Sequence, residues 1–202
     1  MPDAITSLRD DHKKVEKLFK AFEKLEKNDG SATDKRQVVG EIIRELSVHA
    51  AVEEQVFYPA VRKSVEEAED VVLEGLEEHH IVKWTLSELE GMNGDEERFD
   101  AKVKVLMESV RHHVEEEEQE MFPKVREALG RKPLVELFET MEAARNEVPD
   151  TPQPEAPDEA PANLTSPTAA AAAGQPTAKT AAKPAAKGGL LGLRRGKGGG
   201  KS

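Results

Sequence analysis

Apolar residues recur every three or four positions from residue 4 to residue 146, which is the spacing of helices that bury one face. Clusters of turn-forming residues interrupt this spacing at 28–31 and 91–95. The pattern therefore predicts five helices, over residues 4–28, 34–61, 68–90, 96–129 and 133–146. Because Pro59 has no backbone N–H to donate, we expect it to kink or end the last turn of the second helix.

The first four of these helices are long, and the segments between them are short. Short connections place successive helices side by side and antiparallel, so the pattern favours an all-α, up-down-up-down four-helix bundle. The fifth helix is shorter and begins at Pro133, a residue that suits the first position of a helix.

The composition changes sharply near Pro149. Residues 1–148 are rich in Glu, Lys, Leu and Val, whereas Pro, Ala, Thr, Gly and Lys dominate residues 149–202. A segment with so few large apolar side chains cannot bury enough surface to offset the entropy of ordering. We therefore expect one folded domain, 1–148, followed by a disordered tail, 149–202.

The net charge of −11 is unevenly distributed along the chain. The tail carries four acidic and seven basic side chains, so the body holds a net charge of −14. An acidic body repels nucleic acid and anionic membranes. The basic end of the tail leaves two interpretations, a solubilising segment or a weak contact with an acidic surface such as nucleic acid.

The chain contains no cysteine, which excludes disulfides, thiolate metal sites and cysteine nucleophiles. Its N-terminus is charged and does not resemble a signal peptide, and no apolar run approaches the roughly 20 residues that span a bilayer. We therefore expect a soluble, cytoplasmic protein with no membrane partner. The sequence does not predict its oligomeric state.

Polar side chains interrupt the apolar stripe of every long helix. Each stripe includes one histidine, and two of them add a glutamate four residues later, which lies on the same helix face one turn on. The six residues are His12, His49, Glu53, His79, His113 and Glu117.

The same features form an internal repeat. Residues 11–15 match residues 78–82, and the longer stretch 49–59 matches 113–123. Two helical hairpins related in this way would face each other across a pseudo-twofold axis. The repeat therefore predicts one metal ion per hairpin, with the two glutamates bridging the ions.

Burying an unpaired ionised group costs several kcal/mol, and a domain has only about 5–15 kcal/mol of net stability. Hydrogen bonds among the six side chains would satisfy them in part, whereas two metal ions would satisfy all of them at once. Imidazole and carboxylate ligands without thiolate suit iron, manganese or zinc. Only Glu77-x-x-His80 fits the Glu-x-x-His motif of ferritin-like sites, which excludes that alternative.

The motifs of residues 4–130 resemble the hemerythrin-like family, also called the HHE cation-binding domain. The resemblance rests on one motif per helix: His12 within Asp-His-x-x-Val-x-x-Leu-Phe, His49-x-x-x-Glu53, Glu78-His79, and His113-x-x-x-Glu117 followed by Phe-Pro. It implies a four-helix bundle with two oxo- or carboxylate-bridged iron ions. Such a pair would react with dioxygen, peroxide or nitric oxide, as in proteins of oxidative stress. The four histidines would then be terminal ligands.

The sequence departs from oxygen-carrying hemerythrins at two positions. Lys83 stands where the carriers have a second histidine in the third helix. The carriers have an acid five residues after the fourth-helix histidine, whereas this chain offers both Glu117 and Glu118, and the repeat favours Glu117. The missing histidine favours redox chemistry over reversible oxygen carriage.

The remaining polar and aromatic residues near the site have ordinary interpretations. We expect His80 and His112 to face outward or to support the ligands, because each lies about 100° around the helix from its neighbour. We expect Lys83 to reach the surface, with anion steering as the alternative. We expect Tyr58 to pack with a hydrated hydroxyl, or else to act at the metal site. Trp84 is expected in the core.

The sequence leaves more than one function open. The first is a di-iron protein that binds or consumes small oxidants. The second is a non-catalytic sensor of iron or oxygen, whose fifth helix or tail reports to a partner. The third is a purely structural bundle with a polar core layer.

Overall fold

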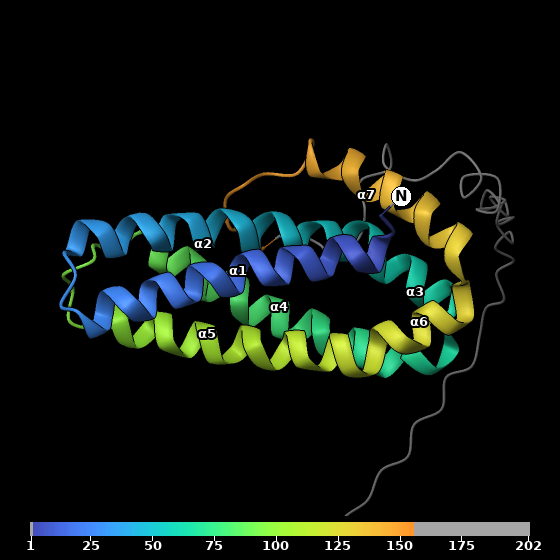
Figure 1. Cartoon of the computed structure of the whole chain (residues 1–202), viewed down its shortest axis with the longest axis horizontal. Helices are drawn as coiled ribbons and strands as arrows, with labels where there is room; N and C mark the ends of the chain where they lie inside the picture. Colours follow the sequence, from blue (N-terminus) through green and yellow to red (C-terminus); the bar gives the residue numbers. More distant parts are fainter. Residues whose placement is uncertain (1, 156–202) are drawn as a thin grey trace, which may run out of the picture. The chain divides into compact units, whose positions relative to one another are not determined.

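The structure is a computed structural model that describes residues 2–155, except for the side chain of Glu66. Every regular element in that range is helical. Four long helices form the bundle: α1 (Ala4–Lys27), α2 (Ala32–Val52), α4 (Glu69–Glu90) and α5 (Phe99–Glu116) (Figure 1). The all-α bundle predicted from the sequence is confirmed.

Most of the tail predicted to be disordered, 149–202, lies outside the described residues. None of the helices within 2–155 is long and apolar enough to cross a membrane.

Side chains close to the helix ends determine where two of the long helices begin. The carboxylate of Asp3 accepts a hydrogen bond of 2.9 Å from the backbone N–H of Thr6, and Ser31 Oγ accepts one of 3.1 Å from Asp34. Each of these bonds satisfies an N–H group that has no partner within its helix.

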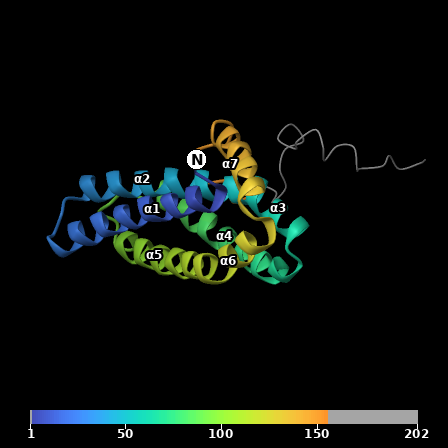
Figure 2. The same ribbon diagram turned by 45° about the vertical axis from the view of Figure 1, so that its right-hand side comes forward.

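Three further helices complete the bundle. They are α3 (Tyr58–Ser64), α6 (Phe122–Leu129) and α7 (Arg131–Arg145), and a single 3-10 turn, Glu66–Ala68, leads into α4. The fifth helix of the sequence pattern corresponds to α7. It packs across α1 and the end of α2, as Figure 2 shows.

Two π-helical segments interrupt what the sequence pattern predicted as continuous helices. The first, Glu53–Phe57, joins α2 to α3, and the second, Glu117–Met121, joins α5 to α6. Pro59 and Pro123 follow them at the start of the next helix. A proline ring clashes with the carbonyl four residues earlier, which favours a wider turn at this place. The two segments begin at the two glutamates of the predicted site, and π segments are frequent at functional sites.

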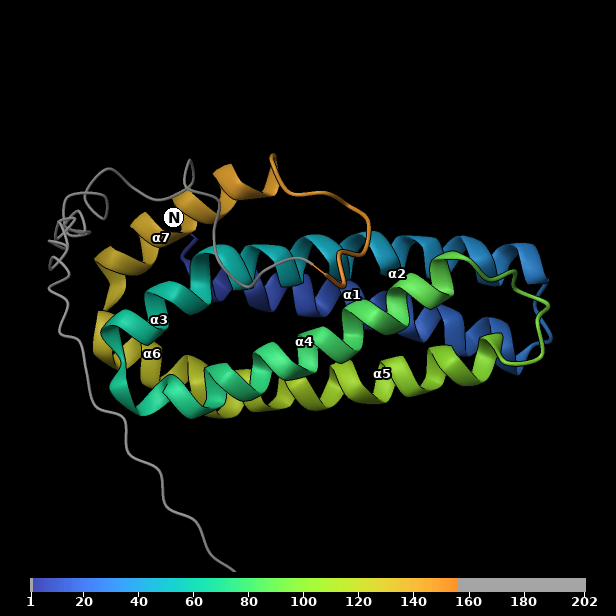
Figure 3. The ribbon, with the colours of Figure 1, turned by 180° about the vertical axis from the view of Figure 1, so that it is seen from behind.

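Two apolar clusters lie along the bundle with the predicted site between them. One cluster includes Leu8, Phe57 and Phe122, close to α7, and the other includes Phe19 and Leu106. Figure 3 shows α4 and α5 running side by side along the bundle. The apolar packing on either side excludes water from the polar layer between them.

The loop between α4 and α5 depends on a glycine at position 94. A Cβ atom there would overlap the carbonyl oxygen of Ala32, which is a rigid backbone atom. We predict that Gly94→Ala lowers the free energy of unfolding by about 1–3 kcal/mol, the usual cost of overpacking. Urea unfolding measures this cost. Gly91→Ala is the matched control, because the nearest atom to its Cβ would be 3.7 Å away. Equal stability of the two variants would contradict this account of the loop.

Candidate metal centre

The four helices of the bundle bring all six predicted site residues into the interior. α1, α2, α4 and α5 each contribute one histidine, and the two π segments contribute one glutamate each. All six side chains are buried. They are His12, His49, Glu53, His79, His113 and Glu117.

The six side chains form two groups that share one carboxylate. In each group, every residue offers one nitrogen or oxygen atom within 4.8 Å of the others. The first group is His12, His49, Glu53 and Glu117, and the second is Glu53, His79 and His113. The histidines therefore divide between the α1/α2 and α4/α5 hairpins, as the internal repeat predicted.

The Nε2 atoms of the histidines face the two buried glutamates. His49 Nε2 lies 3.0 Å from Glu53 Oε2, and His12 Nε2 lies 3.3 Å from Glu117 Oε2. In the second group, the Nε2 atoms of His79 and His113 are only 3.0 Å apart. In each group, the Nε2 and carboxylate oxygen atoms therefore converge on a shared position inside the bundle.

A second set of carboxylates faces the opposite side of each imidazole ring. The distances from Nδ1 to the carboxylate are 2.9 Å for His12 and Glu118, 3.5 Å for His49 and Asp11, 3.1 Å for His79 and Glu54, and 2.7 Å for His113 and Glu78. An ionised carboxylate only accepts hydrogen bonds, so Nδ1 carries the proton. In a neutral ring, Nε2 then keeps its lone pair for a cation, which is the usual arrangement around protein metal sites.

Several atoms of the inner layer have no hydrogen bond. His12 Nε2, Glu117 Oε2 and both carboxylate oxygens of Glu53 are buried without one among the described residues. Orphaned polar atoms of this kind cost free energy unless something else binds them. The donor set, two carboxylates and four imidazoles without thiolate, fits hard or borderline metal cations such as iron, manganese or zinc.

In the absence of a cation, protons partly take its place. Burial lowers the pKa of His49, but the adjacent Glu53 and Asp11 outweigh burial and raise that pKa to about 10. Burial also lowers the pKa of His79, but Glu53 and Glu54 outweigh burial and raise that pKa to about 9. The pKa of Glu53 is well below its usual value, since the two imidazoles overcome the effect of burial. Metal binding therefore displaces protons from the layer.

Tyr58 lies directly against the site, and the expectation that its hydroxyl is hydrated is wrong. The side chain is 1% exposed, and its hydroxyl donates a hydrogen bond of 2.9 Å to Glu117 Oε1. Burial and the neighbouring carboxylates raise the pKa of Tyr58 well above its usual value, so the hydroxyl keeps its proton. A Cβ atom at position 75 would lie 3.1 Å from this oxygen, which is why a glycine fits there.

Two other side chains near the site differ from expectation. Lys83 is buried instead of reaching the surface, and its Nζ donates to Glu54 Oε2 over 2.8 Å. Trp84 is 53% exposed and does not belong to the core. By contrast, His80 and His112 face solvent. Lys83 therefore acts on the site through Glu54, which holds His79.

Sequence reasoning missed the set of outer carboxylates, although the internal repeat contains it. Asp11 and Glu78 each precede a site histidine, and Glu54 and Glu118 each follow a site glutamate. Glu118, considered as a ligand from its spacing, contacts Nδ1 of His12 on the outer side instead. Arg145 of α7, which no motif indicated, pairs with Asp11.

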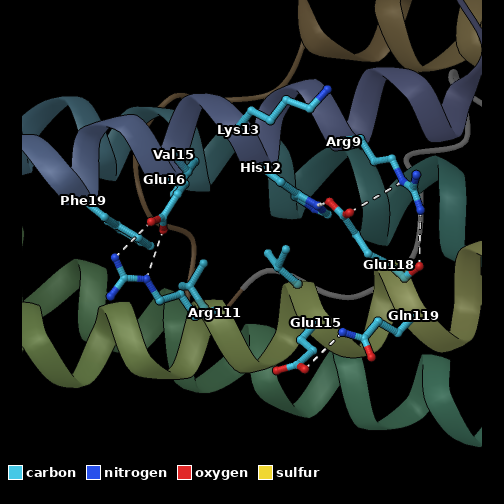
Figure 4. A pocket seen from close by; sticks show the side chains of 12 residues that line it. Arg9, His12, Lys13, Val15, Glu16, Phe19, Arg111, Glu115, Glu118 and Gln119 are labelled. Atoms are coloured by element: carbon cyan, nitrogen blue, oxygen red, sulfur yellow. Dashed lines mark hydrogen bonds and ion pairs between the residues drawn. The ribbon is translucent and has the colours of Figure 1, made fainter.

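An open groove and a small enclosed cavity adjoin the site. The groove, of about 650 Å³, lies between α1 and α5, with His12 and Glu118 among its lining residues (Figure 4). The cavity, of about 20 Å³, is lined by all four site histidines and by apolar side chains. His12, Val15, Val110 and Val114 line both spaces. This shared wall separates solvent from the interior of the site.

Comparison with known proteins identifies the family. A family model described as the hemerythrin HHE cation-binding domain matches residues 3–125. The chain belongs to this family. Hemerythrin HHE domains bind metal cations, and the two groups of buried side chains described above lie within the matched range.

Two curated relatives and one solved structure show how far the similarity extends. An uncharacterized hemerythrin-like protein of Schizosaccharomyces pombe is 28% identical over 75% of this chain and 73% of its own length. A DNA nickase of Nostoc is also 28% identical, over 70% of this chain but only 38% of its own length. The crystal structure of a hemerythrin HHE domain-containing protein from Mycobacterium kansasii, 23% identical, has the same fold, with a TM-score of 0.59 over 73% of this chain and 87% of that chain.

The raised histidine pKa values predict how the stability of the metal-free protein depends on pH. A histidine whose pKa rises on folding stabilises the fold fully below its unfolded pKa, about 6.5, and loses this effect as the pH rises toward the folded value. The free energy of unfolding should therefore fall between pH 6.5 and 9, by on the order of 1 kcal/mol per pH unit for each imidazole. Urea titrations at several pH values measure this slope.

The control for this prediction is His49→Gln, which removes one of the two imidazoles with a raised pKa. Its slope should be about half that of the unmodified chain. A stability that is constant, or that increases, between pH 6.5 and 9 would contradict the pairing of protonated imidazoles with the buried carboxylates.

Proposed function

We propose that this hemerythrin-like chain holds two iron ions and uses them to bind or react with small oxidants such as dioxygen, peroxide or nitric oxide. His12 and His49 would hold one ion, His79 and His113 the other, and Glu53 and Glu117 would bridge the two. The observation that carries the proposal is the set of buried oxygen and nitrogen atoms without a hydrogen bond, which lie between imidazole rings whose Nδ1 atoms face carboxylates. An iron pair supplies redox chemistry toward small oxidants when it is bound.

The cavity beside the histidines supports a small oxidant over a larger substrate. Its volume of about 20 Å³ is close to the space that one water-sized molecule needs. Its other lining residues are apolar, with Leu46, Val82 and Val110 among them. Apolar walls favour uncharged diatomic molecules and exclude ordered water from the site.

The side chains next to the buried carboxylates provide proton control. The hydroxyl of Tyr58 is a protonated donor within 2.9 Å of Glu117 Oε1 and 3.4 Å of His113 Nε2. Lys83 Nζ donates a hydrogen bond of 2.8 Å to Glu54 Oε2. Tyr58 is therefore placed to hold a proton beside the site. His79 and Lys83 together overcome the effect of burial and lower the pKa of Glu54, which both of them contact.

A sensor function remains the second candidate, and one contact favours it. Arg145 of α7 binds Asp11, whose carboxylate lies 3.5 Å from His49 Nδ1. Because α7 lies outside the matched range of 3–125, these contacts would connect a change at His49 to a helix beyond the matched domain. Sustained consumption of the oxidant would distinguish catalysis from sensing. The acidic body of the chain disfavours nucleic acid as a partner.

A pair of adjacent histidines tests the proposed function. His79 is buried in the site, whereas His80 is exposed on the same helix. After reduction of iron-loaded protein, mixing with dioxygen, hydrogen peroxide or nitric oxide should change the optical spectrum of the unmodified chain and of His80→Ala. In His79→Ala, we expect loss of iron and of this reaction. A reaction in His79→Ala equal to that of His80→Ala would contradict the assigned site.

The cavity gives a second prediction that leaves the proposed ligands intact. Val110→Phe puts a larger side chain into the cavity. A steric cost of about 1–3 kcal/mol corresponds to a reaction with the oxidant that is roughly 5- to 150-fold slower. Stopped-flow mixing measures the rate, and elemental analysis checks that the iron content is unchanged. Val105→Phe, at a position of α5 that is 62% exposed, is the control and should react at the unmodified rate. Equal rates in the two variants would mean that the cavity is not the route of entry.

A further inference from the structure

Three of the four outer carboxylates are neutralised by a cationic side chain. The pairs are Glu118 with Arg9, Asp11 with Arg145 and Glu54 with Lys83. The fourth carboxylate, Glu78, contacts no lysine or arginine within residues 2–155. Among the described residues, Glu78 is therefore the one outer carboxylate without a lysine or arginine beside it.

The free oxygen of Glu78 faces two other potential metal ligands. Glu78 Oε1 lies 3.9 Å from His112 Nε2, and His112 Nε2 lies 3.4 Å from Glu116 Oε1. One donor atom from each of the three residues lies within 4.8 Å of the others. Glu78 comes from α4, and the other two come from α5. The cluster thus joins two helices at the surface of the bundle.

The interior of the protein holds Glu78 in place. Its second oxygen accepts a hydrogen bond of 2.7 Å from His113 Nδ1, so its orientation does not depend on the surface cluster. His112 and Glu116 are four residues apart, the same spacing as the two buried His and Glu pairs. Because the side chain of His112 is 64% exposed, solvent reaches the cluster.

We propose that Glu78, His112 and Glu116 bind one divalent transition-metal cation at the surface, separate from the buried centre. One imidazole and two carboxylates form a donor set for manganese, iron, cobalt or zinc. The cation takes the place that Arg9, Arg145 or Lys83 occupies beside the other outer carboxylates. Glu78 then links the surface ion to the buried layer, since its two oxygens face the ion and His113.

Manganese is the probe for this site, since the paramagnetic resonance signal of free aqueous Mn²⁺ decreases on binding. Mn²⁺ is titrated into the purified full chain after its tightly held metal has been measured. The unmodified protein should bind one more Mn²⁺ ion than His112→Ala or Glu116→Gln. Each variant should weaken this binding by at least roughly tenfold. The tightly held metal should be the same in all three proteins.

His80→Ala is the matched control, because it removes an exposed histidine of α4 that is not part of the cluster. It should bind Mn²⁺ as the unmodified chain does, and circular dichroism should show equal helix content in every variant. Equal Mn²⁺ binding by the unmodified chain and His112→Ala would overturn the proposal. So would the absence of Mn²⁺ binding at millimolar concentration. Neither result would depend on whether the buried centre reacts with oxidants.

Discussion

Four imidazoles and two carboxylates share one layer of the bundle, with apolar clusters packed on both sides of it. Their burial is the constraint on which the rest of the structure depends. Charges without partners in such a place cost several kcal/mol each, comparable with the whole net stability of a domain. The fold must therefore supply compensating charge, either as protons on His49 and His79 or as metal cations.

The outer carboxylates complete this balance of charge. Each faces the Nδ1 atom of one imidazole, and so directs the Nε2 lone pair of that ring toward the interior. Each outer carboxylate is the direct sequence neighbour of a residue of the inner layer. Because the inner layer repeats between the two hairpins, the outer carboxylates repeat with it. Arg9, Lys83 and Arg145 then stabilise three of them from further out. Since Arg145 comes from α7, the stability of the inner layer is connected to the helix that follows the family domain.

The sequence pattern predicted the four long helices and the six side chains of the inner layer, because the apolar spacing and the His-x-x-x-Glu pairs are local properties. It could not predict the π segments, which depend on how Pro59 and Pro123 widen the preceding turns. Lys83 lies four residues after His79 and thus on the inward face, but only tertiary structure reveals the buried carboxylate that holds it. Trp84 lies off the apolar stripe, and its size alone suggested the core. The burial of the Tyr58 hydroxyl could not be predicted either, because its acceptor, Glu117, comes from the distant π segment Glu117–Met121.

The central claim is that the buried layer holds two iron ions. Crystals of protein produced in iron-replete medium and purified without chelator would test it directly, through anomalous diffraction on both sides of the iron absorption edge. The account predicts two anomalous peaks per chain, one between His12 and His49 and one between His79 and His113, with Glu53 and Glu117 in contact with both. A single peak, a peak from another element such as zinc, or no peak in this layer would contradict it.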